Sequence, residues 1–113
     1  MHEFVSFMRT LPVLARKVKT VTGTVNIGDY ALLPDKIIVS GVLNWQLFYI
    51  GDDDLTHFAL GEIPFSTFIP VNGAAEGMGA SLSGEIESIE AVISQEGSNV
   101  KIQAVIRIIA VNQ

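Results

Sequence analysis

The chain lacks cysteine, and this absence removes several classes of site. Among its 113 residues there is not one cysteine, so a disulfide framework, a thiolate metal site and a cysteine nucleophile are all impossible. A chain of this length makes one domain and can bury most of its apolar surface without covalent cross-links. Small secreted proteins often depend on disulfides, so the absence favours a reducing compartment without excluding export.

Charge is also scarce, and long apolar runs are missing. Charged residues make up only 17% of the chain, whereas 49% are hydrophobic and the mean hydropathy is +0.43. No apolar run approaches the roughly 18 residues that cross a bilayer, so we expect no membrane span. Apolar residues this dense then indicate either a well-filled core or surface that is buried against another chain. Both explanations remain open.

The few charges are unevenly placed along the chain. The net charge is −5, yet residues 1–19 carry four basic residues and one acid. The rest of the chain carries three basic residues and eleven acids. An acidic body argues against nucleic acid as a partner, because nucleic-acid binding needs a basic face. A basic segment on an acidic body either steers one copy onto the next or is simply a solvated tail.

From residue 18 onward the sequence is typical of β-structure, with Val, Ile, Thr and aromatic runs bounded by Gly, Asp, Asn and Pro. It predicts an all-β fold, a single antiparallel β-sandwich-like domain with an apolar N-terminal arm. A loop over residues 28–34 is expected to end the first strand, and residues 71–80 form the longest loop. The predicted strands cover residues 17–27, 35–50, 55–62 with an extended continuation at 63–70, 81–95 and 100–111.

Three local signals refine this pattern. Pro64 and Pro70 place their segment at a sheet edge or a bend, because proline cannot donate to a central ladder. The apolar phase within 81–95 changes from even to odd positions, which predicts a bulge near Ser88. Glu96–Asn99 predicts a hairpin turn. The last strand is apolar on both faces near its C-terminal end, as expected for a central strand or one that a partner covers.

Residues 1–16 form the predicted arm, and residues 17–113 the β domain. Apolar residues of the arm fit a helical stripe that Pro12 interrupts. The same segment could be extended, with Phe4 on the opposite face from Val5 and Phe7. In either case the arm must pack on its own domain, on a neighbour or on a membrane surface. The candidate subunit-interface residues are Phe4, Val5, Phe7, Met8, Leu11, Val13 and Leu14.

The chain offers no convincing constellation for catalysis, a metal or a cofactor. His2 and His57 lie far apart in sequence, without a second histidine at ligand spacing. The acidic run 52–54 lacks the alternate spacing and the later glutamate of a calcium loop, so a solvated hairpin tip is favoured. Glu85 and Glu87 share one strand face, where acids are usually solvated. We therefore predict no catalytic, metal or cofactor-binding residue, and a protein that is not an enzyme.

Several segments occur together in a family-like order. The most specific is Ile-Pro-Phe-Ser-x-Phe, downstream of an extended strand that contains Val, Gly, Leu and Tyr. With these segments the chain, over residues 17–111, resembles the SPOCS domain of spore-forming Firmicutes. The segments that carry the resemblance are 36–43 (KIIVSGVL), 47–50 (LFYI), 57–58 (HF), 62–68 (EIPFSTF), 77–78 (GM), 85–87 (EIE) and 100–111.

The resemblance implies a β-sandwich-like protein-interaction and assembly role without catalysis. Family members are associated with morphogenesis of the spore envelope, where the domain occurs in tandem and often beside a peptidoglycan-binding LysM module. This chain has one copy and no LysM-like segment, so it cannot bridge much unless it self-associates. Its start is also a poor signal peptide, because Glu3 stands where a basic region is expected and Arg9 and Pro12 break the apolar stretch.

Two functions are therefore expected. The first is a non-catalytic structural subunit of a spore-surface layer or extracellular filament, whose N-terminal arm docks on a neighbouring copy. The alternative is a soluble protein-binding module in spore coat assembly, with the arm folded back on its own domain. The expected partners are the chain itself and other spore-envelope proteins, and the expected location is the spore or cell surface.

Overall fold

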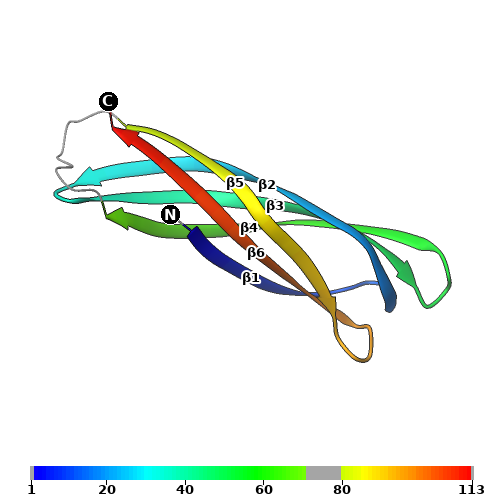
Figure 1. Cartoon of the computed structure of the whole chain (residues 1–113). Coiled ribbons are helices and arrows are strands. Elements are labelled where there is room, and N and C mark those ends of the chain that lie inside the picture. The colour runs from blue at the N-terminus through cyan, green and yellow to red at the C-terminus, as the bar shows by residue number, and fades with distance from the viewer. Residues whose placement is uncertain (1, 71–79, 113) are drawn as a thin grey trace.

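The chain folds into two three-stranded antiparallel sheets packed face to face (Figure 1). The computed structural model describes the backbone of residues 2–70 and 80–112 and the side chains of residues 2–70 and 81–109. The predicted all-β, sandwich-like fold is confirmed, and no helix occurs within the described ranges, so none is available there to span a membrane. The strands are β1 (His2–Thr10), β2 (Ala15–Leu33), β3 (Lys36–Gly51), β4 (Thr56–Pro70), β5 (Ala80–Ile93) and β6 (Asn99–Asn112).

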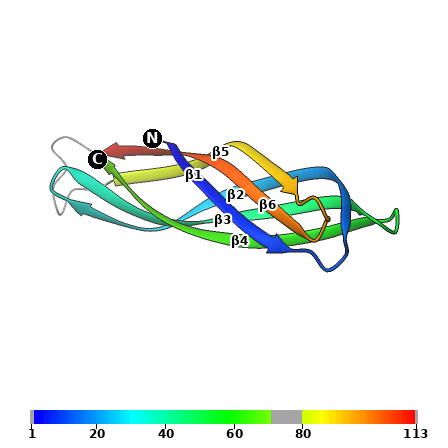
Figure 2. The same cartoon turned by 90° about the horizontal axis from the view of Figure 1, so that it is seen from below.

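One sheet has the order β1-β6-β5 and the other β2-β3-β4. The long strands run nearly along the axis of the molecule, which measures 56 × 18 × 18 Å (Figure 2). Because β3 and β6 are the central strands, each is hydrogen-bonded on both edges. β6 is therefore a central strand, one of the two placements that its apolar residues on both faces predicted.

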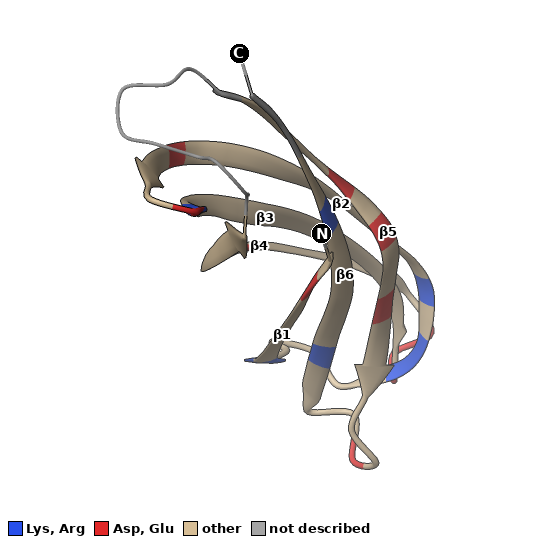
Figure 3. Cartoon of the chain, turned by 60° about the vertical axis from the view of Figure 1, so that its left-hand side comes forward, with Lys and Arg blue, Asp and Glu red and all other residues tan. Residues whose placement is uncertain are grey.

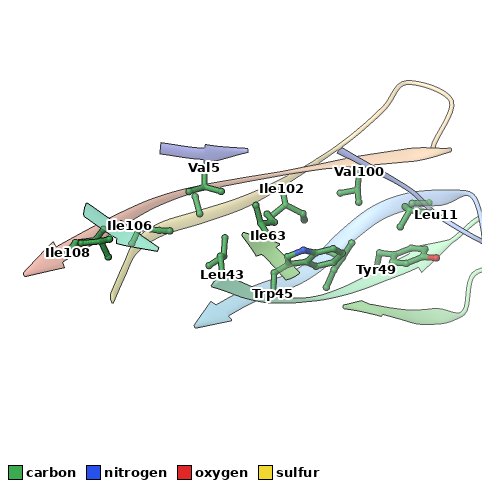
Figure 4. Close-up of a cluster of buried hydrophobic side chains, with 14 of the residues drawn as sticks. Val5, Leu11, Leu43, Trp45, Tyr49, Ile63, Val100, Ile102, Ile106 and Ile108 are labelled. Atoms are coloured by element: carbon green, nitrogen blue, oxygen red, sulfur yellow. The ribbon is translucent and has the colours of Figure 1, made fainter. Parts of the chain in front are cut away.

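The core lies between β3 and β6 and follows the two-residue period of the strands (Figure 4). Trp45 and Tyr49 are the largest fully buried side chains, and their Nε1 and hydroxyl atoms have no hydrogen-bond partner among the described residues. Their rings are therefore held by packing rather than by polar contacts. The buried positions of these two strands are Ile37, Val39, Leu43, Trp45, Leu47, Tyr49, Val100, Ile102, Ala104, Ile106 and Ile108.

The expected loop over residues 28–34 is wrong for most of its length. β2 continues to Leu33, and the chain turns only at Pro34 and Asp35, where Asp35 adopts a left-handed φ of 64°. The Gly28-Asp29 pair instead coincides with a register shift against β3, between Ile27 and Asp29. A bulge at Gly28 accommodates this one extra residue without ending the strand, because Asp29 pairs again with Ser40.

Other local predictions hold. The ladder between β5 and β6 shifts register between Ile86 and Ser88, which confirms the bulge near Ser88. The hairpin turn that follows β5 contains Gly97, with a φ of +80°. Pro64 and Pro70 lie in β4, an edge strand, as proline requires. The expected loop over 71–80 lies outside the described residues except for Ala80, which begins β5.

The N-terminal segment is extended, and it belongs to the sandwich. β1 pairs antiparallel with β6 along its whole length, from His2 opposite Arg107 to Thr10 opposite Asn99. The helical alternative for this segment is therefore wrong, and the extended alternative is confirmed. Phe4 faces away from Val5 and Phe7, as predicted for an extended segment. Four residues, 11–14, then cross to the other sheet and enter β2.

Candidate interaction surface

The seven candidate interface residues divide between the core and the surface. Val5 and Leu11 are each only 6% exposed and pack within their own chain. Phe4 and Met8 alternate with them and remain 63% and 62% exposed on the outer face of the sheet. Two of the seven, Val5 and Leu11, are therefore buried within their own chain, Val13 is half-buried, and the other four, Phe4, Phe7, Met8 and Leu14, are exposed.

The connection that follows β1 is tied to both sheets. The Leu11 N–H donates to the carbonyl of Ser98 at 2.8 Å, and the Leu14 carbonyl accepts from the Asp52 N–H at 2.8 Å. Leu14 itself is exposed, whereas Val13 is half-buried and touches the backbone at Gly51. These bonds hold the crossing segment in place by its backbone, which leaves its apolar side chains only partly covered.

One long side of the sandwich, where β2 lies over β5, is closely packed. A methyl group placed on Gly84 would lie 2.7 Å from Cγ1 of Val25, and one on Gly23 would lie 2.8 Å from Cδ1 of Ile86. The two strands thus approach so closely at these glycines that no side chain fits between them. We call this side of the sandwich, formed by β2 and β5, the closed side.

On the opposite side, the edge strands β1 and β4 contribute Val5 and Ile63 to the core, and polar contacts join the two strands beside them. The Thr67 hydroxyl donates to Oε2 of Glu3 at 3.0 Å, and Nη1 of Arg9 donates to the Leu60 carbonyl at 2.5 Å. The guanidinium carbon of Arg9 also lies 5.5 Å from the centroid of the Trp45 ring. We call this side, formed by β1 and β4, the open side.

A groove of about 520 Å³ follows the open side. Its walls come from the end of β1, from the crossing segment and from β4, and Leu60 is 55% exposed along it. A concave, mainly apolar surface of this kind is typical of a site for another polypeptide or for a small ligand. The lining residues are Arg9, Thr10, Leu11, Pro12, Phe58, Ala59 and Leu60.

The apolar surface continues from the groove onto the outer face of β3 and β4. The rings of Phe48 and Phe58 pair across these strands with their centroids 4.9 Å apart, and both rings are exposed. We call Phe48, Phe58, Leu60 and the groove the open-side surface. Phe58 and Leu60 were not among the predicted interface residues. The signal that could have identified them is the register that pairs residues 48 and 58, because it places an apolar patch on a face that Thr20 and Thr22 otherwise make polar.

The free edge of β4 is poorly suited to accept another strand. Pro64 lacks an N–H and lies opposite Val42, so the even positions of β4 must direct their backbone groups away from β3. On that outward edge Pro64 supplies no donor, and Arg9 already takes the carbonyl of Leu60. Proline and charge are usual ways to block an edge strand. The open-side surface is therefore better suited to bind side chains than to extend the β2-β3-β4 sheet.

The acidic turn and its histidine serve local structure. Asp53 accepts the Leu55 N–H at 3.0 Å and lies 2.9 Å from Nε2 of His57, and Asp54 pairs with Arg16 at 2.7 Å. The Leu55 N–H is the main cause that lowers the pKa of Asp53 below its ordinary value, and His57 adds to it. The geometry is that of a stabilised hairpin tip.

Three further acids, Glu85, Glu87 and Glu90, are exposed on β5, where Figure 3 shows a row of acidic positions along the strand. Glu85 pairs with Arg107 at 3.4 Å, and Glu87 contacts His2 at 2.8 Å. These exposed pairs run across the β1-β6-β5 sheet, and pairs of this kind contribute little to stability.

Comparison with known proteins agrees with the resemblance seen in the sequence. Residues 15–94 match the model of the family described as SipL, SPOCS domain. The matched residues run from the first residue of β2 to just beyond β5, so β1 and β6 lie outside them. No curated protein and no solved structure matches the chain. Because the match covers more than two thirds of its length, the chain belongs to the SipL SPOCS-domain family.

Proposed function

We propose that this chain is a non-catalytic protein-binding module in assembly of the spore coat, located at the spore or cell surface. Membership of the SPOCS family supports a spore-related role. The observation that carries the proposal is the open-side surface, where Phe58 and Leu60 are exposed beside the groove between β1 and β4. Apolar surface of this kind on a small domain is typical of a protein-binding site.

The partner would be a polypeptide that inserts apolar side chains into the groove. Arg9 borders the groove and keeps N–H groups beyond the one bonded to Leu60, so it can also bind a carboxylate or a backbone carbonyl of the partner. Phe58 and Phe48 offer rigid aromatic area, which residues at binding hot spots commonly provide. Other spore-envelope proteins are the class of partner that we propose.

The test uses a fluorescent fusion of the chain in a sporulating bacterium. Wild-type protein is expected to accumulate around the developing spore, whereas the double variant Phe58→Glu/Leu60→Glu should remain diffuse, because each new carboxylate would be buried against the partner. Val92→Glu is the matched control, since Val92 is an exposed apolar residue on β5, away from the open side. Thermal unfolding must show that all three proteins remain folded.

Two results would contradict the proposal. One is a wild-type fusion that never associates with the spore. The other is a folded Phe58→Glu/Leu60→Glu variant that accumulates there as wild type does, because then the open-side surface does not recruit the chain.

A second candidate is a self-assembling structural subunit whose N-terminal arm docks on a neighbouring copy. It is favoured by the outward-facing Phe4 and Met8, which their own chain leaves exposed. Electron microscopy of negatively stained, purified protein tests it. Filaments or ordered layers that disappear in a folded Phe4→Glu/Met8→Glu variant would support arm docking, and dispersed particles at all concentrations would argue against self-assembly.

A further inference from the structure

We propose that β1 pairs with β1 of a second copy, antiparallel and centred on Ser6, and so joins two β1-β6-β5 sheets into one six-stranded sheet. This inference goes beyond the proposed binding of other proteins, because purified chain alone can make the contact. It also differs from arm docking, since each β1 stays on its own β6.

Among the edges that the structure describes, β1 is the one suited to such pairing. It has nine residues, contains no proline and has no strand on its outer edge within the described chain. The edge of β4 is obstructed at Pro64 and Leu60, as described above. β2 and β5 pack closely on each other, and β2 shifts register against β3 at three places. Irregular or covered edges accept new strands poorly.

The β1 sequence is complementary to itself in one register. When Ser6 faces Ser6 of the second copy, the strands overlap over the entire range His2–Thr10. Glu3 then faces the second copy's Arg9, and both point to the side of the sheet that faces β4, where each already contacts that strand. Opposite charges on one face of directly paired residues stabilise a sheet, and like charges destabilise it.

The apolar residues match in the same register. Phe4 faces Met8 of the second copy on the outer face, where these two residues are among the most exposed apolar side chains of the molecule. Val5 faces Phe7 of the second copy on the inner face, where Phe7 is exposed at present. The pairing would therefore cover all three exposed apolar side chains of β1.

Shifted registers lose this match. A shift of one residue places side chains of one copy against the opposite face of the other, because the side-chain period is two. A shift of two residues places Glu3 opposite Phe7, or Arg9 opposite Val5. Charges that point inward on an edge strand usually prevent pairing. In β1, Glu3 and Arg9 would permit the register centred on Ser6 and would oppose the shifted registers.

The existing contacts of these charges are compatible with the pairing. Glu3 uses Oε2 to accept from Thr67, which leaves Oε1 for an arginine. Arg9 uses Nη1 for the Leu60 carbonyl and keeps its other N–H groups. A two-fold axis through the strand centre then brings both charge pairs together at once, as an interface between identical surfaces requires.

Charge variants test the register. Glu3→Arg and Arg9→Glu each create two like-charge pairs in a homodimer and should weaken dimerisation roughly tenfold or more. An equimolar mixture should form the heterodimer at near wild-type affinity, because every pair is then of opposite charge. Sedimentation velocity measures affinity, native mass spectrometry identifies the heterodimer, and circular dichroism checks that each variant is folded.

Cross-linking tests the geometry. The chain has no cysteine, so Ser6→Cys introduces a unique thiol at the proposed axis. A short bismaleimide should link two Ser6→Cys chains rapidly, whereas Ser83→Cys, exposed on β5, is the control and should link only slowly. Exchange of β1 between copies would instead place Ser6 beside Gln103 of the partner chain. The proposal would be overturned if the Ser6→Cys/Gln103→Cys variant formed interchain links while the Ser6→Cys variant formed none.

Two further outcomes would also overturn it. One is a wild-type chain that stays monomeric at every concentration up to roughly 1 mM, the affinity expected of the weakest specific contacts. The other is a mixture of folded Glu3→Arg and Arg9→Glu proteins that associates no better than either alone.

Discussion

The two long sides of the sandwich differ in how they are joined. On the closed side, Gly23 and Gly84 let β2 and β5 approach until isoleucine and valine side chains fill the remaining space. On the open side, β1 and β4 meet through Glu3 with Thr67 and Arg9 with Leu60, and apolar rings beside these contacts face solvent. The same core therefore has one side sealed by packing and one side held by polar bridges.

The difference separates stability from binding. A sealed side contributes free energy of folding, because packed methyl groups are removed from water. A side held by exposed polar contacts contributes little to folding and leaves apolar area for another chain. We therefore expect substitutions on the closed side to act on unfolding, and substitutions of the exposed apolar residues on the open side to act mainly on association.

The largest expected effect is at Gly97, in the turn between β5 and β6. Its φ is +80°, and a methyl group there would lie 2.3 Å from the carbonyl oxygen of Ala15, the residue whose N–H it binds. Gly97→Ala should lower the free energy of unfolding by about 3 kcal/mol, since strain and a backbone clash add. Urea denaturation measures it. Gly28→Ala is the control, with its nearest contact at 3.4 Å, and an equal loss there would refute the reason given.

The next effect should distinguish the two sides directly. Gly84→Val forces a side chain against Val25 and should cost about 2 kcal/mol of unfolding free energy. Leu60→Ala on the open side should cost about 0.5 kcal/mol or less, because the side chain is mostly exposed. Thermal and urea unfolding of both variants compare the values. If Leu60→Ala lowers the unfolding free energy as much as Gly84→Val does, Leu60 is packed in the fold and is not available as an exposed binding surface.

A smaller effect is expected for the bridge across the open side. Arg9→Gln removes the stacking of the guanidinium over Trp45 and weakens the bond to Leu60, so the unfolding free energy should fall by about 1 kcal/mol. Arg107→Gln removes an exposed pair with Glu85 and should have less effect. Parallel denaturation curves provide the comparison. Equal losses of unfolding free energy in the two variants would mean that the contacts of Arg9 stabilise the fold no more than the exposed Arg107–Glu85 pair does.

The smallest effect concerns the hairpin tip beyond the open side. The lowered pKa of Asp53 in the folded chain means that the folded state holds the ionised form more firmly than the unfolded state does. Its stabilisation is therefore present above the unfolded pKa and is lost as the pH falls through the lower, folded pKa. Unfolding of wild type and Asp53→Asn should differ at neutral pH and converge in acid. A difference that stays constant with pH would contradict this cause.

Much of the fold could be predicted from single strands. The odd positions of β3 and the even positions of β6 are buried because alternation in a central strand is unambiguous, and the phase change near Ser88 could only be accommodated by a bulge. The prediction of a loop over residues 28–34 was wrong because Gly28-Asp29 has the composition of a turn, whereas in the structure a bulge accommodates it.

The open-side surface could not be predicted in the same way. Its residues come from β1, the segment after it, β3 and β4, and their proximity follows only from the registers and the packing of the two sheets. For the same reason the sequence did not show which arm residues would be buried. Val5 and Leu11 enter the core because β1 pairs with β6, a contact between strands about a hundred residues apart.

Hydrogen–deuterium exchange at rising protein concentration tests the central claim most directly, that the closed side stabilises the fold whereas the open side makes contacts between chains. The account predicts that peptides covering β1 gain protection as concentration rises, while peptides covering β2 and β5 stay equally protected throughout. Protection of β1 that does not change with concentration, or a gain confined to β2 and β5, would contradict it.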